Sequence, residues 1–194
     1  MRGGGTAMQI EFLPGTTMPY SVLKGSAFEL LVPMLNATGG LSLSQVCAIT
    51  GLEGSTIQNW VKRGLVAKPV DKKYFERQLA RILMINALRD CMQLDRIAEL
   101  LRYLNGLVED KSDDIIREAQ LFDYLCEILR KIDLKSGFSL EIVENTVLET
   151  IADYSGPFAD SKHKLCKGLC LMTIAYVSGR LKSQADFLYD ELMG

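Results

Sequence analysis

One ten-residue segment, residues 56–65, carries polar side chains whose types and spacing suit hydrogen bonding to a nucleic acid. Gln58 and Asn59 are adjacent amides, and each can pair with the edge of an adenine through two hydrogen bonds. Lys62 and Arg63 follow one helical turn later and offer cations to guanine or to phosphate. The segment therefore predicts a helix with one polar face directed at DNA.

The neighbouring residues predict how this helix is held. Ile57, Trp60 and Val61 recur at i, i+3 and i+4, which predicts an inner face that packs on a preceding helix. We expect that preceding helix to begin soon after Leu41, with Ser42 or Ser44 as its cap, and to end at Gly51. This order is typical of a helix-turn-helix unit.

The start of the second helix offers a place for phosphate. Ser55 is the predicted N-cap, and Ser55 and Thr56 can hold a phosphate together with the free backbone amides of the first turn. Gly64 is expected to end the helix. Residues 65–67 and 73–75 can then pair as a small hairpin wing. The wing residues expected to contact the flanking DNA backbone are Lys68, Lys72, Lys73 and Tyr74.

Basic charge is concentrated in one segment, although the formal net charge of the chain is −2. Residues 55–89 hold eight Lys and Arg against two Asp and Glu, whereas residues 90–194 hold twelve against nineteen. Such segregation is typical of a localised anion-binding face. In the helix expected over residues 75–91, we predict that the exposed side chains include Arg77, Arg81 and Arg89.

The segment from Thr56 to Leu65 resembles the recognition helix of MerR-type winged-helix regulators, in which a Thr-aliphatic pair, an aromatic residue and Gly-Leu recur in this order. The resemblance covers about residues 41–104 and continues through Pro69, the Lys72-Lys73-Tyr74 pattern and the helices carrying Leu79, Ile82 and residues 94–101. The chain is also similar to an uncharacterised bacterial family, mostly from Firmicutes, that joins a MerR-like domain to a helical C-terminal half.

This resemblance implies a bacterial transcription regulator that binds duplex DNA, and pairing as a homodimer would let it contact two half-sites. The chain departs from the family pattern at three positions. MerR recognition helices usually carry Arg-Tyr where this chain has Gln58-Asn59, and an acidic residue where it has Val61. The base preference of the family therefore does not carry over.

The predicted fold class is mainly α, with an N-terminal winged helix-turn-helix domain and a small β-hairpin wing, followed by an all-helical region. We expect an N-terminal arm with a short helix over residues 1–40, the winged domain over 41–106 and the helical region over 107–194. The acidic stretch 109–114 marks the boundary, and Ser178-Gly179 is expected to separate the last two helices.

Two roles remain open for the helical C-terminal region, namely dimerisation and the binding of an unknown small-molecule effector. Aromatic and methionine side chains between its helices can line an effector pocket or simply form core. These candidates are Phe122, Tyr124, Met172, Tyr176 and Phe187.

His163, Cys166 and Cys170 fall on one helical face, and their imidazole and thiol groups suit a soft metal or an oxidant-sensing site. The alternative is that both cysteines are core residues, because free cysteine is among the most buried residue types. The five cysteines form no disulfide pattern and are expected to be free thiols in a reducing compartment. We expect no metal and no cofactor.

The sequence offers no catalytic pair, nucleophile elbow or phosphate-binding loop, and it holds a single histidine. An enzyme is therefore not expected. Without a signal peptide pattern or a long apolar run, a cytoplasmic location without membrane association is expected. Two alternatives to a DNA-binding regulator remain: a protein-interaction module or antirepressor that reuses the fold, and a small-molecule or metal-responsive sensor.

Overall fold

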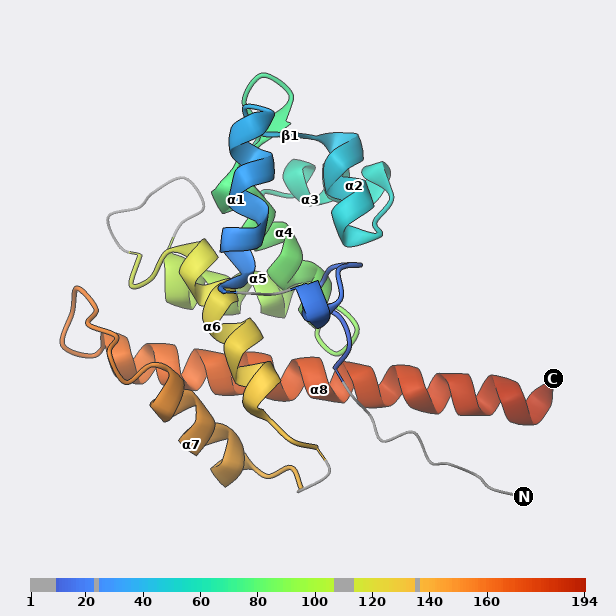
Figure 1. Cartoon of the computed structure of the whole chain (residues 1–194), viewed down its shortest axis with the longest axis vertical. Helices are drawn as coiled ribbons and strands as arrows, with labels where there is room; N and C mark the ends of the chain where they lie inside the picture. Colours follow the sequence, from blue (N-terminus) through green and yellow to red (C-terminus); the bar gives the residue numbers. More distant parts are fainter. Residues whose placement is uncertain (1–9, 23–24, 107–113, 135–136) are drawn as a thin grey trace.

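The protein is mainly helical, as predicted. The structure, a computed structural model, describes residues 10–22, 25–106, 114–134 and 137–194 (Figure 1). Within these ranges it has eight α-helices, a short 3-10 helix and two short strands. The 3-10 helix is Tyr20–Val22, the strands are β1 (Leu41–Ser42) and β2 (Lys73–Tyr74), and the α-helices are α1 (Ala27–Ala37), α2 (Leu43–Thr50), α3 (Gly54–Lys62), α4 (Glu76–Leu88), α5 (Leu94–Asn105), α6 (Glu118–Lys131), α7 (Leu140–Thr150) and α8 (Ser161–Met193).

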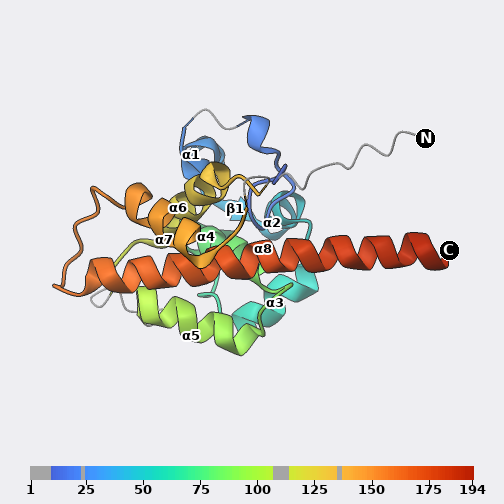
Figure 2. The ribbon, with the colours of Figure 1, turned by 90° about the horizontal axis from the view of Figure 1, so that it is seen from below.

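Helix α4 is the centre of the molecule. It packs against α2, α5, α6 and α8, and nearly all of its side chains are buried. Helices α2 and α3 lie at one end of the molecule, whereas α7 lies at the other end beside α8 (Figures 1 and 2). The buried apolar residues of all these helices form one continuous cluster, so the two halves of the chain share a core.

The caps predicted for α2 are confirmed. The Ser42 side chain accepts a hydrogen bond from the Gln45 amide, and the Gln45 side chain accepts one from the Ser42 amide. Gly51 ends the helix with φ of 70°, a left-handed conformation that costs glycine least. This defined end sets the position of the turn that leads into α3.

Residues 10–22 of the N-terminal arm pack on the helices. Leu13 is buried, and the Thr17 hydroxyl donates to the carbonyl of Ala48 at 3.1 Å. The Tyr20 hydroxyl donates to the carbonyl of Cys126 at 3.0 Å. The arm therefore ties α2 to α6.

The predicted pairing of residues 65–67 with 73–75 is wrong, since β2 pairs antiparallel with β1 instead. Tyr74 lies opposite Leu41 in this pair. Side chains of α4 bond to carbonyls of the segment that precedes the turn: Arg81 Nε donates to the Leu65 carbonyl at 2.7 Å, and Gln78 Nε2 donates to that of Lys68 at 3.0 Å. Only the tip of the hairpin forms, where Val70 bridges to Lys73.

The break expected at Ser178-Gly179 is absent, and α8 runs uninterrupted over 33 residues. A single glycine inside a helix costs only about 1 kcal/mol. Packing explains its place here, because a Cβ on Gly179 would lie 3.2 Å from the Cβ of Asp90. Of the predicted acidic boundary, residues 109–113 lie outside the described ranges, and Asp114 pairs with Arg77 at 3.5 Å.

Within the described residues, no helix combines the length and the apolar composition needed to cross a bilayer.

Candidate nucleic-acid interface

Helix α3 presents the two faces that its spacing predicts. Ile57 and Trp60 are 0% and 2% exposed and anchor the helix in the core. The turn before the helix is closed by Leu52, which is also buried. These anchors fix both the rotation and the depth of α3, so its other face is held in a defined orientation.

The outward face of α3 carries Gln58, Asn59 and Lys62, all of them exposed. Arg63 follows at the C-cap and pairs with Asp95 of α5 at 2.8 Å. Both partners of this ion pair are largely exposed, so the pair contributes little to stability and an incoming phosphate can compete for the arginine. The four predicted polar residues therefore lie together on one accessible surface.

The N-terminus of α3 differs from the prediction in one detail. Glu53, not Ser55, is the N-cap, and its side chain makes no capping hydrogen bond. Ser55 lies in the first turn and lines an open hollow together with Thr56 and Arg89. Arg89 is not among the DNA contacts predicted from the sequence, although it belongs to the same basic segment.

The tip of the wing is a two-residue turn. The amide of Lys73 donates to the Val70 carbonyl at 2.8 Å, and the amide of Val70 donates back at 3.0 Å. Asp71 and Lys72 both have positive φ, 49° and 61°, as a type I′ turn requires. This geometry leaves the Lys72 side chain exposed at the end of the molecule.

We expect Lys72→Gly to raise the free energy of unfolding by about 0.5 to 1 kcal/mol, since glycine adopts positive φ without steric strain. Urea denaturation of the two proteins measures the difference. Lys68→Gly is the matched control, because Lys68 is also exposed but lacks positive φ. A gain of the same size in the control would contradict the explanation by turn strain.

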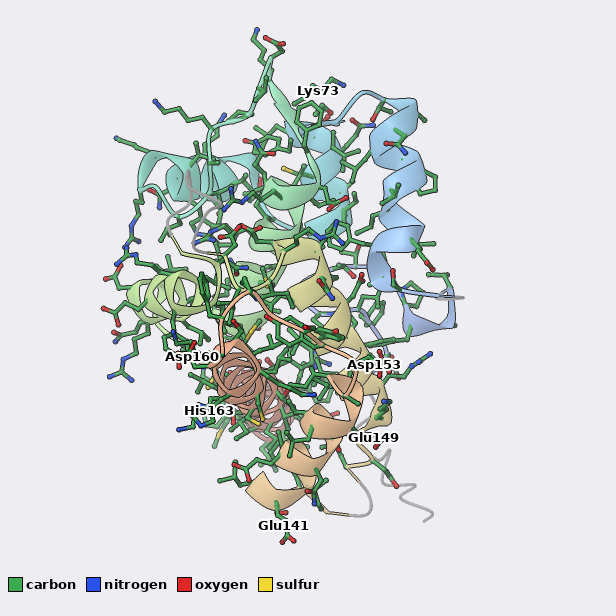
Figure 3. All side chains as sticks on the ribbon, turned by 90° about the vertical axis from the view of Figure 1, so that its left-hand side faces the viewer. Lys73, Glu141, Glu149, Asp153, Asp160 and His163 are labelled. Atoms are coloured by element: carbon green, nitrogen blue, oxygen red, sulfur yellow. The ribbon has the colours of Figure 1, made fainter. Side chains whose placement is uncertain are left out.

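Two wing residues are less accessible than predicted. Tyr74 is 3% exposed and packs in the core, so its prediction as a DNA contact is wrong in this structure. Lys73 is half-buried, and its Nζ donates to the Thr38 carbonyl at 3.3 Å. Figure 3 shows Lys73 near one end of the molecule and Glu141 at the other. Successive side chains of a strand point to opposite sides. One side of β2 faces the core, and Tyr74 is on that side.

The prediction that Arg77 and Arg81 are exposed is wrong. Glu118, in the first turn of α6, lies 2.6 Å from Arg77 Nε and 3.6 Å from Arg81 Nη1. Arg81 and Glu118 are each only 4% exposed in their side chains. Burial lowers the pKa of Arg81 below the usual value for arginine, and the nearby Glu118 carboxylate opposes this effect without cancelling it. These two arginines therefore hold α4 to α6.

The remaining basic residues of the segment 55–89 define the charge of the surface. Lys62, Lys68 and Lys72 are exposed and make no ion pair with any described residue. Arg89 is exposed and lies 4.0 Å from Asp90. We call the set Ser55, Thr56, Gln58, Asn59, Lys62, Arg63, Lys68, Lys72 and Arg89 the basic face.

The histidine and cysteines considered for a metal site do not form one. Among the residues that the structure describes, no group of three His, Cys, Asp or Glu side chains is arranged to hold a metal. His163 is exposed, whereas Cys170 is buried. Burial, followed by the neighbouring Cys166, raises the pKa of Cys170 to about 12.

We expect iodoacetamide at neutral pH to alkylate Cys91 first, because Cys91 is the most accessible of the five cysteines. Cys126 and Cys170 should stay unmodified until the protein unfolds, since burial keeps both thiols protonated and covered. Mass spectrometry of tryptic peptides over a time course measures the order. Early alkylation of Cys170 would contradict its placement in the core.

The candidates for effector binding are not brought together around one cavity. Phe122 and Met172 are core residues, Tyr176 is mostly buried but lines a hollow with Asn86 and Arg180, and Phe187 is 61% exposed on the last turns of α8. Tyr124 lines a separate hollow beside Tyr154.

The basic face lies within a segment of the chain that matches a protein family. Residues 39–125 match a family described as "Domain of unknown function (DUF1836)". Over 96 residues the chain is 29% identical to the uncharacterized protein YkrK of Bacillus subtilis (strain 168), a match that covers 47% of this chain and 41% of YkrK. No solved structure gives a significant match. The matched residues 39–125 therefore include the whole basic face and both partners of the Arg77–Glu118 ion pair.

Proposed function

We propose that the protein is a sequence-specific DNA-binding transcription regulator, with a MerR-like winged helix-turn-helix over α2, α3 and the wing turn. The observation that carries the proposal is the outward face of α3. It presents two adjacent amides and two cations on a helix whose opposite side is fixed by Ile57 and Trp60. A helix held in this way can enter a major groove without changing its position in the protein.

The division of roles follows from the chemistry of the side chains. Gln58 and Asn59 can each make two hydrogen bonds to one adenine and supply the base preference. Lys62, Lys68 and Lys72 neutralise phosphates and supply most of the affinity, which makes binding dependent on salt. Ser55 and Thr56, beside Arg89, offer hydroxyls and a cation to a phosphate next to the α3 N-terminus.

A mobility-shift titration against genomic duplex fragments at two salt concentrations tests the proposal. We expect binding at low salt that weakens steeply as salt rises. With about five phosphates neutralised, the logarithm of the association constant should fall with a slope of about −4.5 against the logarithm of salt concentration. Absence of binding at low salt by correctly folded protein would refute the proposal. A partner protein that co-purifies in that case would favour the interaction-module alternative.

A further inference from the structure

A hollow lies between the N-terminal arm, the end of α4 and the middle of α8. Its volume of about 430 Å³ is within the range of about 300 to 1,000 Å³ that is usual for small-molecule sites. We call it the arm hollow. Its lining includes Glu11, Leu13, Asn86, Ala87, Tyr176 and Arg180.

The walls of the arm hollow are held in place by hydrogen bonds and buried contacts. Asn86 Nδ2 donates to the Gly15 carbonyl at 2.9 Å and to the Thr50 carbonyl at 3.0 Å, which ties the arm to α4 and α2. Leu13 is only 1% exposed, so the arm is also anchored in the core. A preformed hollow of this kind can bind a ligand without first ordering its own residues.

One buried polar group of the lining has no hydrogen-bond partner among the described residues. Tyr176 is only 7% exposed, and its hydroxyl makes no hydrogen bond with any of them. Burial raises the pKa of Tyr176 to about 12, so the hydroxyl keeps its proton at neutral pH and can act as a hydrogen-bond donor. Buried polar groups in proteins are normally hydrogen-bonded. The Tyr176 hydroxyl therefore indicates a ligand that supplies an acceptor.

Donors and acceptors come from different walls of the arm hollow. Tyr176 and Arg180 are four residues apart on α8, which places the phenol and the guanidinium on the same face of the helix. Glu11 lies on the arm. Asn86 lies on α4 with both its amide hydrogens already bonded to carbonyls, so its carbonyl oxygen is left to accept. One wall can therefore bind an anionic group, whereas the other two can bind a cationic group.

The charges around the arm hollow favour a ligand that carries both signs. Arg89 and Asp90 also line it, but they lie 4.0 Å apart and largely offset each other. Arg180 and Glu11 are exposed, and neither makes an ion pair with any described residue. A zwitterionic ligand would pair with both, whereas a ligand of a single charge would leave one of them unmatched.

Part of the lining is apolar and suits a hydrocarbon side chain. Leu13 and Ala87 are 1% and 6% exposed, and the ring of Tyr176 adds an aromatic surface. Small-molecule sites usually combine such a lining with a few polar groups that fix the orientation of the ligand.

We propose that the arm hollow binds a free α-amino acid with an apolar side chain. The ligand carboxylate accepts hydrogen bonds from the Arg180 guanidinium and the Tyr176 hydroxyl. Its ammonium group donates to the Glu11 carboxylate and to Asn86 Oδ1. Its apolar side chain packs against Leu13.

Isothermal titration calorimetry on the full chain tests the proposal without DNA, and so independently of the proposed function. The probes are L-valine, L-leucine, L-isoleucine, L-methionine and L-phenylalanine. We expect at least one of them to bind with one molecule per chain. The amine and the carboxylic acid that share its side chain each lack one charged group, so each should bind at least about tenfold more weakly. Absence of binding by all five at millimolar concentration, or equal binding of the singly charged analogues, would overturn the proposal.

Substitutions in the lining locate the binding site. Arg180→Gln and Glu11→Gln should each weaken binding of the amino acid about tenfold, because each removes one charged partner. Arg96→Gln and Glu99→Gln are the matched controls, since both residues are exposed on α5 and neither lines the hollow. The controls should bind as wild type does. Unchanged binding in the lining variants, or an equal loss in the controls, would contradict binding in the arm hollow.

Tyr176→Phe tests the unpaired hydroxyl separately. It removes the hydroxyl and keeps the ring, so we expect binding of the amino acid to weaken about tenfold. The midpoint of thermal unfolding without ligand should stay the same or rise, because the hydroxyl has no partner among the described residues. Binding that stays at the wild-type level would contradict the contact between Tyr176 and the ligand carboxylate.

Discussion

Glu118→Ala is expected to lower the free energy of unfolding by about 3 to 5 kcal/mol. The Glu118 carboxylate lies 2.6 Å from Arg77 Nε and 3.6 Å from Arg81 Nη1, and its side chain is 4% exposed. Removing it leaves the buried Arg81 guanidinium without its closest carboxylate, and a buried charge that loses its partner is costly. Urea denaturation followed by circular dichroism measures the loss.

The control for this substitution lies on the same helix. Glu127 pairs with Lys131 at 3.0 Å on the surface of α6, so Glu127→Ala should change stability by no more than about 1 kcal/mol. Glu118→Gln keeps the size of the side chain and an acceptor, and it should fall between the two alanine variants. Similar losses for Glu118→Ala and Glu127→Ala would contradict a buried role for the Arg77–Glu118 pair.

The combined variant Lys62→Ala, Lys68→Ala and Lys72→Ala is expected to lower DNA affinity by at least tenfold at low salt and to reduce the salt slope by about 2.7. Each lysine is exposed on the basic face and is expected to release counterions by neutralising one phosphate. Stability should change little, because none of the three pairs with a described carboxylate. Fluorescence anisotropy with a labelled duplex measures both quantities across a salt series.

Three exposed lysines elsewhere supply a control for net charge, namely Lys131, Lys162 and Lys167; Lys131 pairs with Glu127 and Lys162 donates to the Ala152 carbonyl, so circular dichroism first checks that this variant is folded. The triple alanine variant at these positions loses the same total charge, but its changes lie on α6 and α8. We expect its salt slope to equal that of wild type. An equal loss in the two triple variants would show that net charge alone drives binding and that the basic face has no special role.

The local parts of the fold could be predicted from the sequence. The period of Ile57 and Trp60 predicts which side of α3 is buried, and Ser42 and Gly51 predict the ends of α2, because capping depends on neighbouring residues alone. The amides Gln58 and Asn59 then follow on the exposed side from helix geometry.

The long-range parts could not be predicted from local patterns. Arg77 has its partner 41 residues away, so local periodicity marks it as one more exposed cation. The strand β2 pairs with β1, which precedes α2 in the chain, and α4 side chains bond to the carbonyls of Leu65 and Lys68. Gly179 stops a helix in local statistics, but here it allows α8 to approach Asp90. In each case a tertiary contact outweighs a local preference of about 1 kcal/mol.

Selection of bound sequences from a random pool of duplex DNA by the purified protein tests sequence-specific binding through α3. The proposed function predicts that successive rounds enrich a shared motif, and that Gln58→Ala with Asn59→Ala removes or changes it while the protein remains folded. A pool that stays random after repeated rounds with folded wild type would contradict sequence-specific binding through α3.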